Sequence, residues 1–84
     1  MTEQDILPIL KTIVTPYTQN KAALETFSTE TDLINDLQIN SANLVDVVLD
    51  VEDEFKITID NDSMEKMLSV EKAVQVIQEK LGDS

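Results

Sequence analysis

The stretch from Ser41 to Phe55, SANLVDVVLDVEDEF, constrains the fold more than any other part of this chain. When its residues are placed at intervals of about 100° around a helix axis, five apolar side chains fall into one stripe roughly 100° wide. These five are Leu44, Val47, Val48, Val51 and Phe55. A stripe of this width is typical of a helix that buries one side in a core. The pattern therefore predicts an amphipathic helix over residues 41–55, with the stripe facing the core.

Two further segments repeat apolar residues at helical spacing. Near the amino terminus the repeat runs from Ile6 to Tyr17 and predicts a helix that ends near Pro16. Its start stays open, because Pro8 suits a first turn but kinks a helix interior. Near the carboxyl end, Ser69 is a suitable cap for a helix that stops at Gly82. The residues expected to face inward there are Val70, Ala73, Val74, Ile77 and Leu81.

The remaining segments predict connections and one short helix. Residues 18–40 are rich in Thr, Ser, Asn and Asp, with a helix-like fragment at 21–25, and a loop this long is normally functional or internally packed. Its apolar residues Leu33, Ile34, Leu37 and Ile39 are candidates to fix it to the core. Residues 57–59 predict an extended connector, and the capping box at 62–65 predicts a short helix through Leu68. The sum is a single all-α domain of three main helices, one short helix and a long first loop.

The charge of the chain restricts its partners. Seventeen acidic residues stand against six lysines among 84 residues, which gives a net charge of −11. Phosphates of nucleic acid and of an anionic membrane surface would be repelled, so we expect no nucleic acid and no membrane as a partner. The same charge favours proteins with basic docking patches. We expect the chain to be monomeric.

The residue types that are missing exclude most active sites. Without cysteine or histidine, the chain cannot form a zinc site, a Ser-His-Asp triad or a Cys-His pair. Gly82 is the sole glycine, so no glycine-rich phosphate loop is possible. A calcium loop counted from Asp60 fails, because Met64 and Glu65 occupy positions that need an oxygen ligand and a glycine. We therefore expect no catalytic residue and no metal ligand. The amino terminus lacks a signal peptide, which predicts a cytoplasmic protein.

One shoulder of the helix over residues 41–55 lies outside the core stripe and combines apolar with acidic residues. Ala42, Val45 and Leu49 fall together there, and Asp46, Glu52 and Asp53 border them. An apolar strip with a carboxylate rim is typical of a docking surface for a basic partner. An ordinary solvated helix face with a few aliphatic residues explains the same pattern equally well.

Ser41 stands at the predicted start of this helix. Backbone N–H groups are unpaired at a helix start and the helix dipole favours an anion there, so a phosphate ester on the Ser41 hydroxyl would lie in a favourable field. A serine at a helix start is more often a simple N-cap, and either Asn40 or Ser41 suits that role. The residues alone leave both interpretations open.

From these residues the chain resembles the acyl carrier protein family, whose signature is an Asp-Ser-Leu tripeptide followed by an apolar and acidic helix. The corresponding stretch here is Asn40-Ser41-Ala42, followed by LVDVVL at 44–49 and EDEF at 52–55. The segments ITID at 57–60 and MEK at 64–66 are similar to the family's third-helix region. The resemblance covers nearly the whole chain. It implies a small four-helix bundle of the acyl-carrier-protein type over residues 1–84.

The resemblance also implies a function. Ser41 would be the attachment point of a 4′-phosphopantetheine arm, transferred from coenzyme A by a phosphopantetheinyl transferase, with Asn40 flanking it. An acyl group would be held on the arm as a thioester, and the chain itself would not be an enzyme. The shoulder described above would correspond to the family's recognition helix, which binds acyl-loading, condensing or tailoring enzymes through Ala42, Val45, Asp46, Leu49, Glu52 and Asp53.

Three positions depart from the family's pattern. Asn40 replaces the aspartate before the serine, Ala42 replaces the leucine after it, and Gln38 stands where the family usually has glycine. These changes bear on which transferase acts on Ser41 and on the pathway, which could be fatty-acid-like, polyketide or otherwise specialised. The alternatives are an aminoacyl or aryl carrier protein, and an unmodified acidic interaction module with the same fold.

Overall fold

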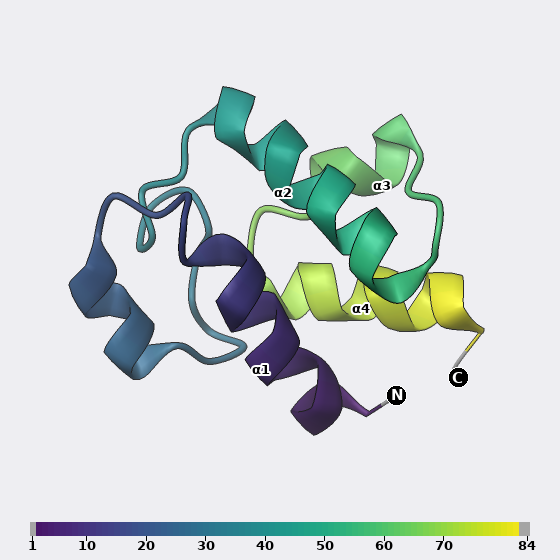
Figure 1. Cartoon of the computed structure of the whole chain (residues 1–84), viewed down its shortest axis with the longest axis horizontal. Helices are drawn as coiled ribbons and strands as arrows, with labels where there is room; N and C mark the ends of the chain where they lie inside the picture. Colours follow the sequence, from purple (N-terminus) through teal and green to yellow (C-terminus); the bar gives the residue numbers. More distant parts are fainter. Residues whose placement is uncertain (1, 83–84) are drawn as a thin grey trace.

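The computed structural model describes residues 2–82, and these form helices joined by loops (Figure 1). The elements are α1 (Glu3–Val14), the 3-10 helix η1 (Lys21–Thr26), α2 (Ser41–Phe55), α3 (Asn61–Lys66) and α4 (Val70–Leu81). Helix α1 packs against both α2 and α4, and α3 packs against α4. Within the described residues the β pairing is limited to an isolated bridge between Asp32 and Ser69. The all-α prediction is therefore confirmed.

Helix α1 begins at Glu3, which settles the start that the sequence left open. Thr2 and Asp5 form a capping box, in which the Asp5 N–H donates to Thr2 Oγ1 and the Thr2 N–H donates to Asp5 Oδ2. Pro8 lies inside the helix, where it removes one main-chain donor without ending the helix. Ile6, Leu10 and Val14 are completely buried, so one side of α1 faces the core.

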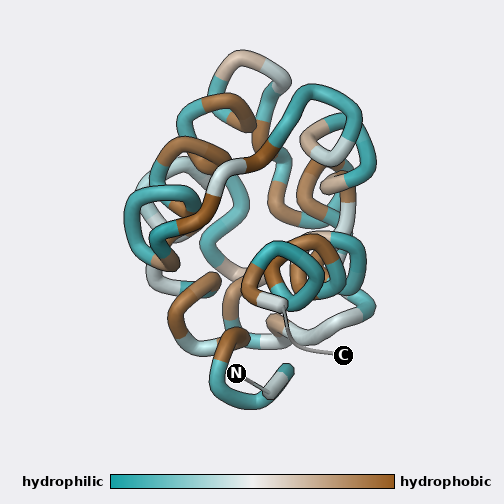
Figure 2. Tube along the Cα trace, turned by 90° about the vertical axis from the view of Figure 1, so that its right-hand side faces the viewer, coloured by the Kyte–Doolittle hydropathy of each residue, from teal (hydrophilic) through white to brown (hydrophobic). Residues whose placement is uncertain are grey.

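Helix α2 has the boundaries that its periodicity predicts. Asn40 is the N-cap, and its side-chain oxygen accepts from the Asn43 N–H at 2.8 Å. All five residues of the predicted stripe are buried: Leu44, Val47, Val48, Val51 and Phe55. Lys56 ends the helix in the left-handed conformation at φ 57°. Figure 2 shows hydrophobic and hydrophilic positions alternating along the helical coils, as expected of amphipathic helices.

The long loop between α1 and α2 is internally packed. Leu33, Leu37 and Ile39 are buried as predicted, whereas Ile34 is half-buried. Its main chain also pairs with the start of α4, because the Leu33 N–H donates to the Leu68 carbonyl at 3.0 Å and the Val70 N–H donates to the Thr31 carbonyl at 2.9 Å. These bonds hold the loop against the start of α4. The loop then continues through Ile39 and Asn40 into α2.

The connector at 57–59 belongs to no helix or strand, and the start and end of α3 differ from the prediction. The prediction that a capping box at Asp62 opens the helix is wrong, because Asp60 is the N-cap and accepts from the Ser63 N–H at 3.1 Å. The helix ends at Lys66 and does not reach Leu68. The physical reason is the burial of Ile59 directly before the cap, which fixes where the chain turns into the helix.

Helix α4 closes the bundle. Ser69 caps it by accepting from the Lys72 N–H at 3.2 Å, and Gly82 ends it at φ 82°, both as predicted. Val70, Ala73, Val74 and Ile77 are buried, whereas Leu81 is half-buried; Val76 is buried although the sequence did not indicate it. The buried residues of all these segments join into one hydrophobic core.

Candidate functional site

Ser41 is the first residue of α2 and its side chain is exposed. Because Asn40 supplies the cap, the Ser41 hydroxyl is not needed for capping. Within residues 2–82 this hydroxyl has no hydrogen-bond partner. The structure therefore separates the two roles that the sequence left open at this helix start: Asn40 caps, and Ser41 presents a free hydroxyl.

Some main-chain N–H groups at the start of α2 have no hydrogen-bond acceptor within the described residues. The Asn43 N–H donates to the Asn40 side chain and the Leu44 N–H donates to the Asn40 carbonyl at 2.9 Å. The N–H groups of Ser41 and Ala42 precede the first intrahelical bond and have no acceptor in the described part of the chain. With the positive end of the helix dipole at this point, the residues present are compatible with a phosphate ester on Ser41.

The segment that leads into Ser41 is fixed by the core. Ile39 is 1% exposed, and its N–H donates to the Leu33 carbonyl at 3.1 Å. Gln38 adopts a left-handed conformation at φ 56°, which favours glycine. This explains in physical terms why glycine suits the position that Gln38 occupies.

The shoulder predicted from the sequence lies on one helix, and we call it the α2 outer face: Ala42, Val45, Asp46, Leu49, Glu52 and Asp53. Val45 and Leu49 are 44% and 56% exposed, and with Leu68 they are the large hydrophobic side chains that stand out as exposed among the described residues. Asp46 and Asp53 are exposed as well. The face thus combines accessible apolar surface with free carboxylates.

Glu52 differs from the other members of the α2 outer face. Its side chain is half-buried, and its Oε2 accepts a hydrogen bond from the Ile59 N–H at 2.6 Å. The carboxylate is therefore engaged with the connector between α2 and α3. Nothing in the sequence pattern indicates this bond, because it joins residues that are seven positions apart across a helix end.

Tyr17 and Asp50 form a second contact that the sequence did not indicate. The Tyr17 hydroxyl donates to Asp50 Oδ2 at 2.7 Å and so connects the turn after α1 to α2. This hydrogen bond is the main cause that raises the pKa of Tyr17 above its ordinary value. In the sequence Tyr17 is part of an apolar repeat, which gives no sign of a polar partner.

Leu68 is the third large hydrophobic residue with high exposure, at 48%. It lies between α3 and α4, where its main chain pairs with Leu33 while its side chain faces outward. The sequence placed it at the end of the short helix and gave no reason to expect exposure.

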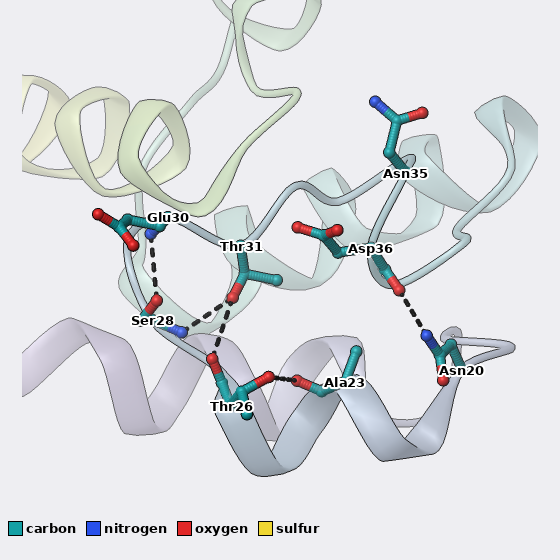
Figure 3. Close-up of a pocket in the computed structure, with 8 residues that line it drawn as sticks. All are labelled: Asn20, Ala23, Thr26, Ser28, Glu30, Thr31, Asn35 and Asp36. Atoms are coloured by element: carbon teal, nitrogen blue, oxygen red, sulfur yellow. Dashed lines mark hydrogen bonds between the residues drawn. The ribbon is translucent and has the colours of Figure 1, made fainter.

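A polar hollow of about 390 Å³ lies in the long first loop (Figure 3). Its side chains are bonded to one another and to the loop: Thr31 Oγ1 accepts from the Ser28 N–H at 3.0 Å, and Asn20 Nδ2 donates to the Asp36 carbonyl at 2.9 Å. None of the site residues predicted from the sequence lines it. We interpret it as part of the loop's own structure.

Residues 2–82 lack the features of two other kinds of site. No helix there is both long and apolar enough to cross a membrane. In the same residues, no group of three or more Asp or Glu side chains is arranged to hold a metal ion.

Comparison with known proteins finds several relatives that are described as acyl carrier proteins. An acyl carrier protein of Picosynechococcus sp. is 35% identical over 79 residues, which cover 94% of this chain and 95% of the relative. An acyl carrier protein of Lactobacillus acidophilus is 30% identical over 82 residues, which cover 98% of this chain and all of the relative. An acyl carrier protein of Thermotoga maritima is 43% identical over a shorter region, 63% of this chain and 65% of the relative. No family model matches the chain.

Proposed function

Because this chain belongs to the acyl carrier protein family, we propose that it carries acyl groups on a 4′-phosphopantetheine arm attached to Ser41. The observation that supports this most directly is the exposed, unbonded hydroxyl of Ser41 at the start of α2. When bound, the arm supplies the thiol that this cysteine-free chain lacks. We propose that residues 1–84 act as one carrier domain.

The residues around Ser41 have separate tasks in this proposal. Asn40 caps α2 and keeps the Ser41 hydroxyl free, and the unpaired N–H groups of Ser41 and Ala42 would help to hold a phosphodiester at Ser41. Ile39, buried in the core, holds the attachment point in a fixed place relative to the bundle. A carrier needs this arrangement, because a transferase and later enzymes must find the same short segment.

We propose that partner enzymes dock on the α2 outer face. Val45 and Leu49 offer apolar contacts that core packing does not use, and Asp46 and Asp53 offer free charge. A net charge of −11 draws partners with basic patches by long-range attraction. The partners would be a phosphopantetheinyl transferase and acyl-loading, condensing or tailoring enzymes of a fatty-acid-like, polyketide or other specialised pathway.

The test is a labelling experiment with coenzyme A and a broad-specificity phosphopantetheinyl transferase, read by intact mass. We expect the wild type to gain the mass of one phosphopantetheine and the Ser41→Ala variant to gain none. Ser63→Ala is the matched control, because Ser63 also lies in the first turn of a helix, and it is expected to label like the wild type. Labelling of the Ser41→Ala variant would contradict the assignment. An unlabelled wild type after several transferases would favour the unmodified interaction module.

The cargo requires a separate measurement. The intact mass of protein from its native host would show the arm and whatever is bound to it. A fatty-acyl series would place the chain in fatty-acid synthesis, and an aminoacyl or aryl group would identify it as a carrier of that kind.

A further inference from the structure

Helix α1 carries two apolar hollows that are separate from the α2 outer face. The first has a volume of about 320 Å³, and its walls include Pro8, Ile9 and Ile13 of α1 and Glu54 of α2. Ile9 and Ile13 pack against the core with part of their surface and are only half-buried, so the rest of each side chain stays open. This hollow therefore offers apolar surface next to a carboxylate.

The second hollow lies on the other side of Pro8. At about 100° per residue, Leu7 and Ile9 project from α1 on opposite sides of Pro8. The second hollow has a volume of about 390 Å³, and its walls include Leu7, Pro8 and Phe27 together with Lys11. Phe27 directly follows η1, so the first loop supplies one wall. This hollow offers apolar surface next to an ammonium group.

Core packing does not explain the proline between the two hollows. Pro8 lies inside α1 and is exposed, although proline is the least favourable residue in a helix interior. Because Pro8 has no N–H, the Gln4 carbonyl lacks the donor that the residue four positions on normally supplies. Gln4 also lines the second hollow. The surface of α1 thus presents a rigid apolar ring and a main-chain acceptor that the helix itself does not use.

The two hollows face a different direction from the α2 outer face. At about 100° per residue, Glu54 lies roughly 140° around α2 from Leu49. Asp50 is on the same side as Glu54, and its bond to Tyr17 shows that this side of α2 faces α1. Glu54 is also far from Ser41, roughly 20 Å along the helix axis at 1.5 Å per residue. A protein that fills the hollows therefore leaves Ser41 uncovered.

The charges beside the hollows indicate the kind of partner. Glu54 and Lys11 make no ion pair and no side-chain hydrogen bond within residues 2–82. Lys11 is the only basic residue in α1. A uniformly basic partner, which suits the α2 outer face, is repelled by Lys11, whereas a partner with one basic and one acidic residue is attracted at both hollows.

We propose that the two hollows form a second docking surface, the Pro8 surface, for an amphipathic helix of another protein. Apolar side chains at helical spacing enter the hollows on either side of Pro8, as when a helix binds in a groove. A basic residue of this helix pairs with Glu54, and an acidic residue pairs with Lys11. The inference goes beyond the proposed function and does not depend on the arm. A protein bound there can hold the chain while enzymes reach Ser41.

The first test adds a synthetic amphipathic peptide to the full chain. The mixed peptide has about 18 residues, enough to form a helix, with leucines along one side, glutamate toward one end and lysine toward the other. We expect it to shift the methyl NMR signals of Ile9 and Ile13. An all-lysine version should shift those of Val45 and Leu49 instead. Ile9 and Ile13 signals that stay unshifted at about 1 mM mixed peptide, or that respond more to the all-lysine peptide, overturn the proposal.

Charge reversal tests the pairing. Lys11→Glu and Glu54→Lys should each weaken binding of the mixed peptide about fivefold, and the double variant should bind like the wild type, because the helix then binds in the opposite direction. Asp53→Lys is the matched control, since it makes the same charge change one position away on the α2 outer face, and it should leave binding unchanged. Single variants that bind like the wild type, or a double variant that binds no better than they do, contradict the pairing.

Pro8→Ala separates docking from stability. We expect it to raise the melting temperature, because alanine is favoured in a helix interior, and yet to weaken binding of the mixed peptide. Unchanged binding in Pro8→Ala would remove Pro8 from the docking surface and so overturn the proposal as stated. None of these measurements uses Ser41 or coenzyme A, so labelling of Ser41 can fail while the Pro8 surface binds the peptide, and the reverse.

Discussion

Tyr17 and Asp50 form a contact whose ionisation can be followed directly. The hydroxyl of Tyr17 donates to Asp50, and this bond, with the negative charge of Asp50 and Asp46 nearby, raises the pKa of Tyr17 above the ordinary value of 10.0. Because the bond requires the protonated phenol, its stabilising effect is complete below pH 10 and is lost as the pH rises through the raised pKa. Tyr17 is the sole tyrosine and the chain has no tryptophan, so tyrosinate absorbance reports this group alone.

We expect Asp50→Asn to lower the pKa of Tyr17 toward its ordinary value, measured by spectrophotometric titration of the folded protein. The wild type should also have a higher melting temperature than Tyr17→Phe at pH 7, and this difference should disappear at a pH above the raised pKa. A Tyr17 titration that is identical in wild type and Asp50→Asn would show that the hydrogen bond does not form in solution.

Gln38 adopts a left-handed backbone conformation that favours glycine. At φ 56° a side chain with a Cβ is strained, and Gln38 is exposed, so its side chain has no packing role to lose. We expect Gln38→Gly to raise the free energy of unfolding by about 0.5–1 kcal/mol, measured by urea denaturation. Gln38→Ala keeps the Cβ and should give no such gain. Equal stabilities of the glycine and alanine variants would contradict a backbone origin.

At the scale of elements, the boundaries of α2 and α4 were predictable from the sequence, whereas the start and end of α3 were not. The stripe from Leu44 to Phe55 set the register of α2, and Ser69 and Gly82 marked the ends of α4, because caps and periodicity are local properties of the sequence. The predicted start of α3 was wrong because Asp60 and Asp62 are both plausible N-caps. Burial of Ile59, a tertiary effect, decides between them.

Some features of the candidate site could likewise be predicted from the sequence, and others could not. The sequence could place Ser41 at a helix start and group the α2 outer face, since both follow from position along one helix. It could not show that Asn40 alone caps α2, that Glu52 bonds to Ile59, or that Leu68 is exposed. Each of these depends on how a loop or connector folds back, which a helical repeat does not encode.

The long first loop is an element whose stability depends on a few buried side chains. Leu37 is completely buried in the core, whereas Ile34 in the same loop is half-buried. We expect Leu37→Ala to lower the free energy of unfolding by about 2–5 kcal/mol, because it leaves a cavity in the core. Ile34→Ala should cause a smaller loss, and urea denaturation of both variants measures the difference. Equal losses would mean that Leu37 does not anchor the loop.

At the scale of the whole molecule, charge opposes the compact state. The chain carries a net charge of −11, and α2 contributes five of its acidic residues, Asp46, Asp50, Glu52, Asp53 and Glu54, without a single basic residue. Three of the five lie near the carboxyl end of the helix, where the helix dipole also disfavours negative charge. Folding brings these charges closer together than they are in the unfolded chain, so their repulsion destabilises the native state.

Salt should therefore stabilise this protein. Raising the ionic strength from about 0.01 M to about 1 M shortens the screening length from about 30 Å to about 3 Å, which removes most of the repulsion along α2. We expect the melting temperature to rise by about 4–8 °C, corresponding to about 1 kcal/mol for a domain of this size. Magnesium chloride should raise the melting temperature as well. Asp53→Asn, which removes one charge from the carboxyl end of α2, should start from a higher melting temperature and gain less from salt. A melting temperature that does not change across the titration would show that repulsion within α2 has no weight in the stability of the fold, and the acidic residues would then matter only for what the surface attracts.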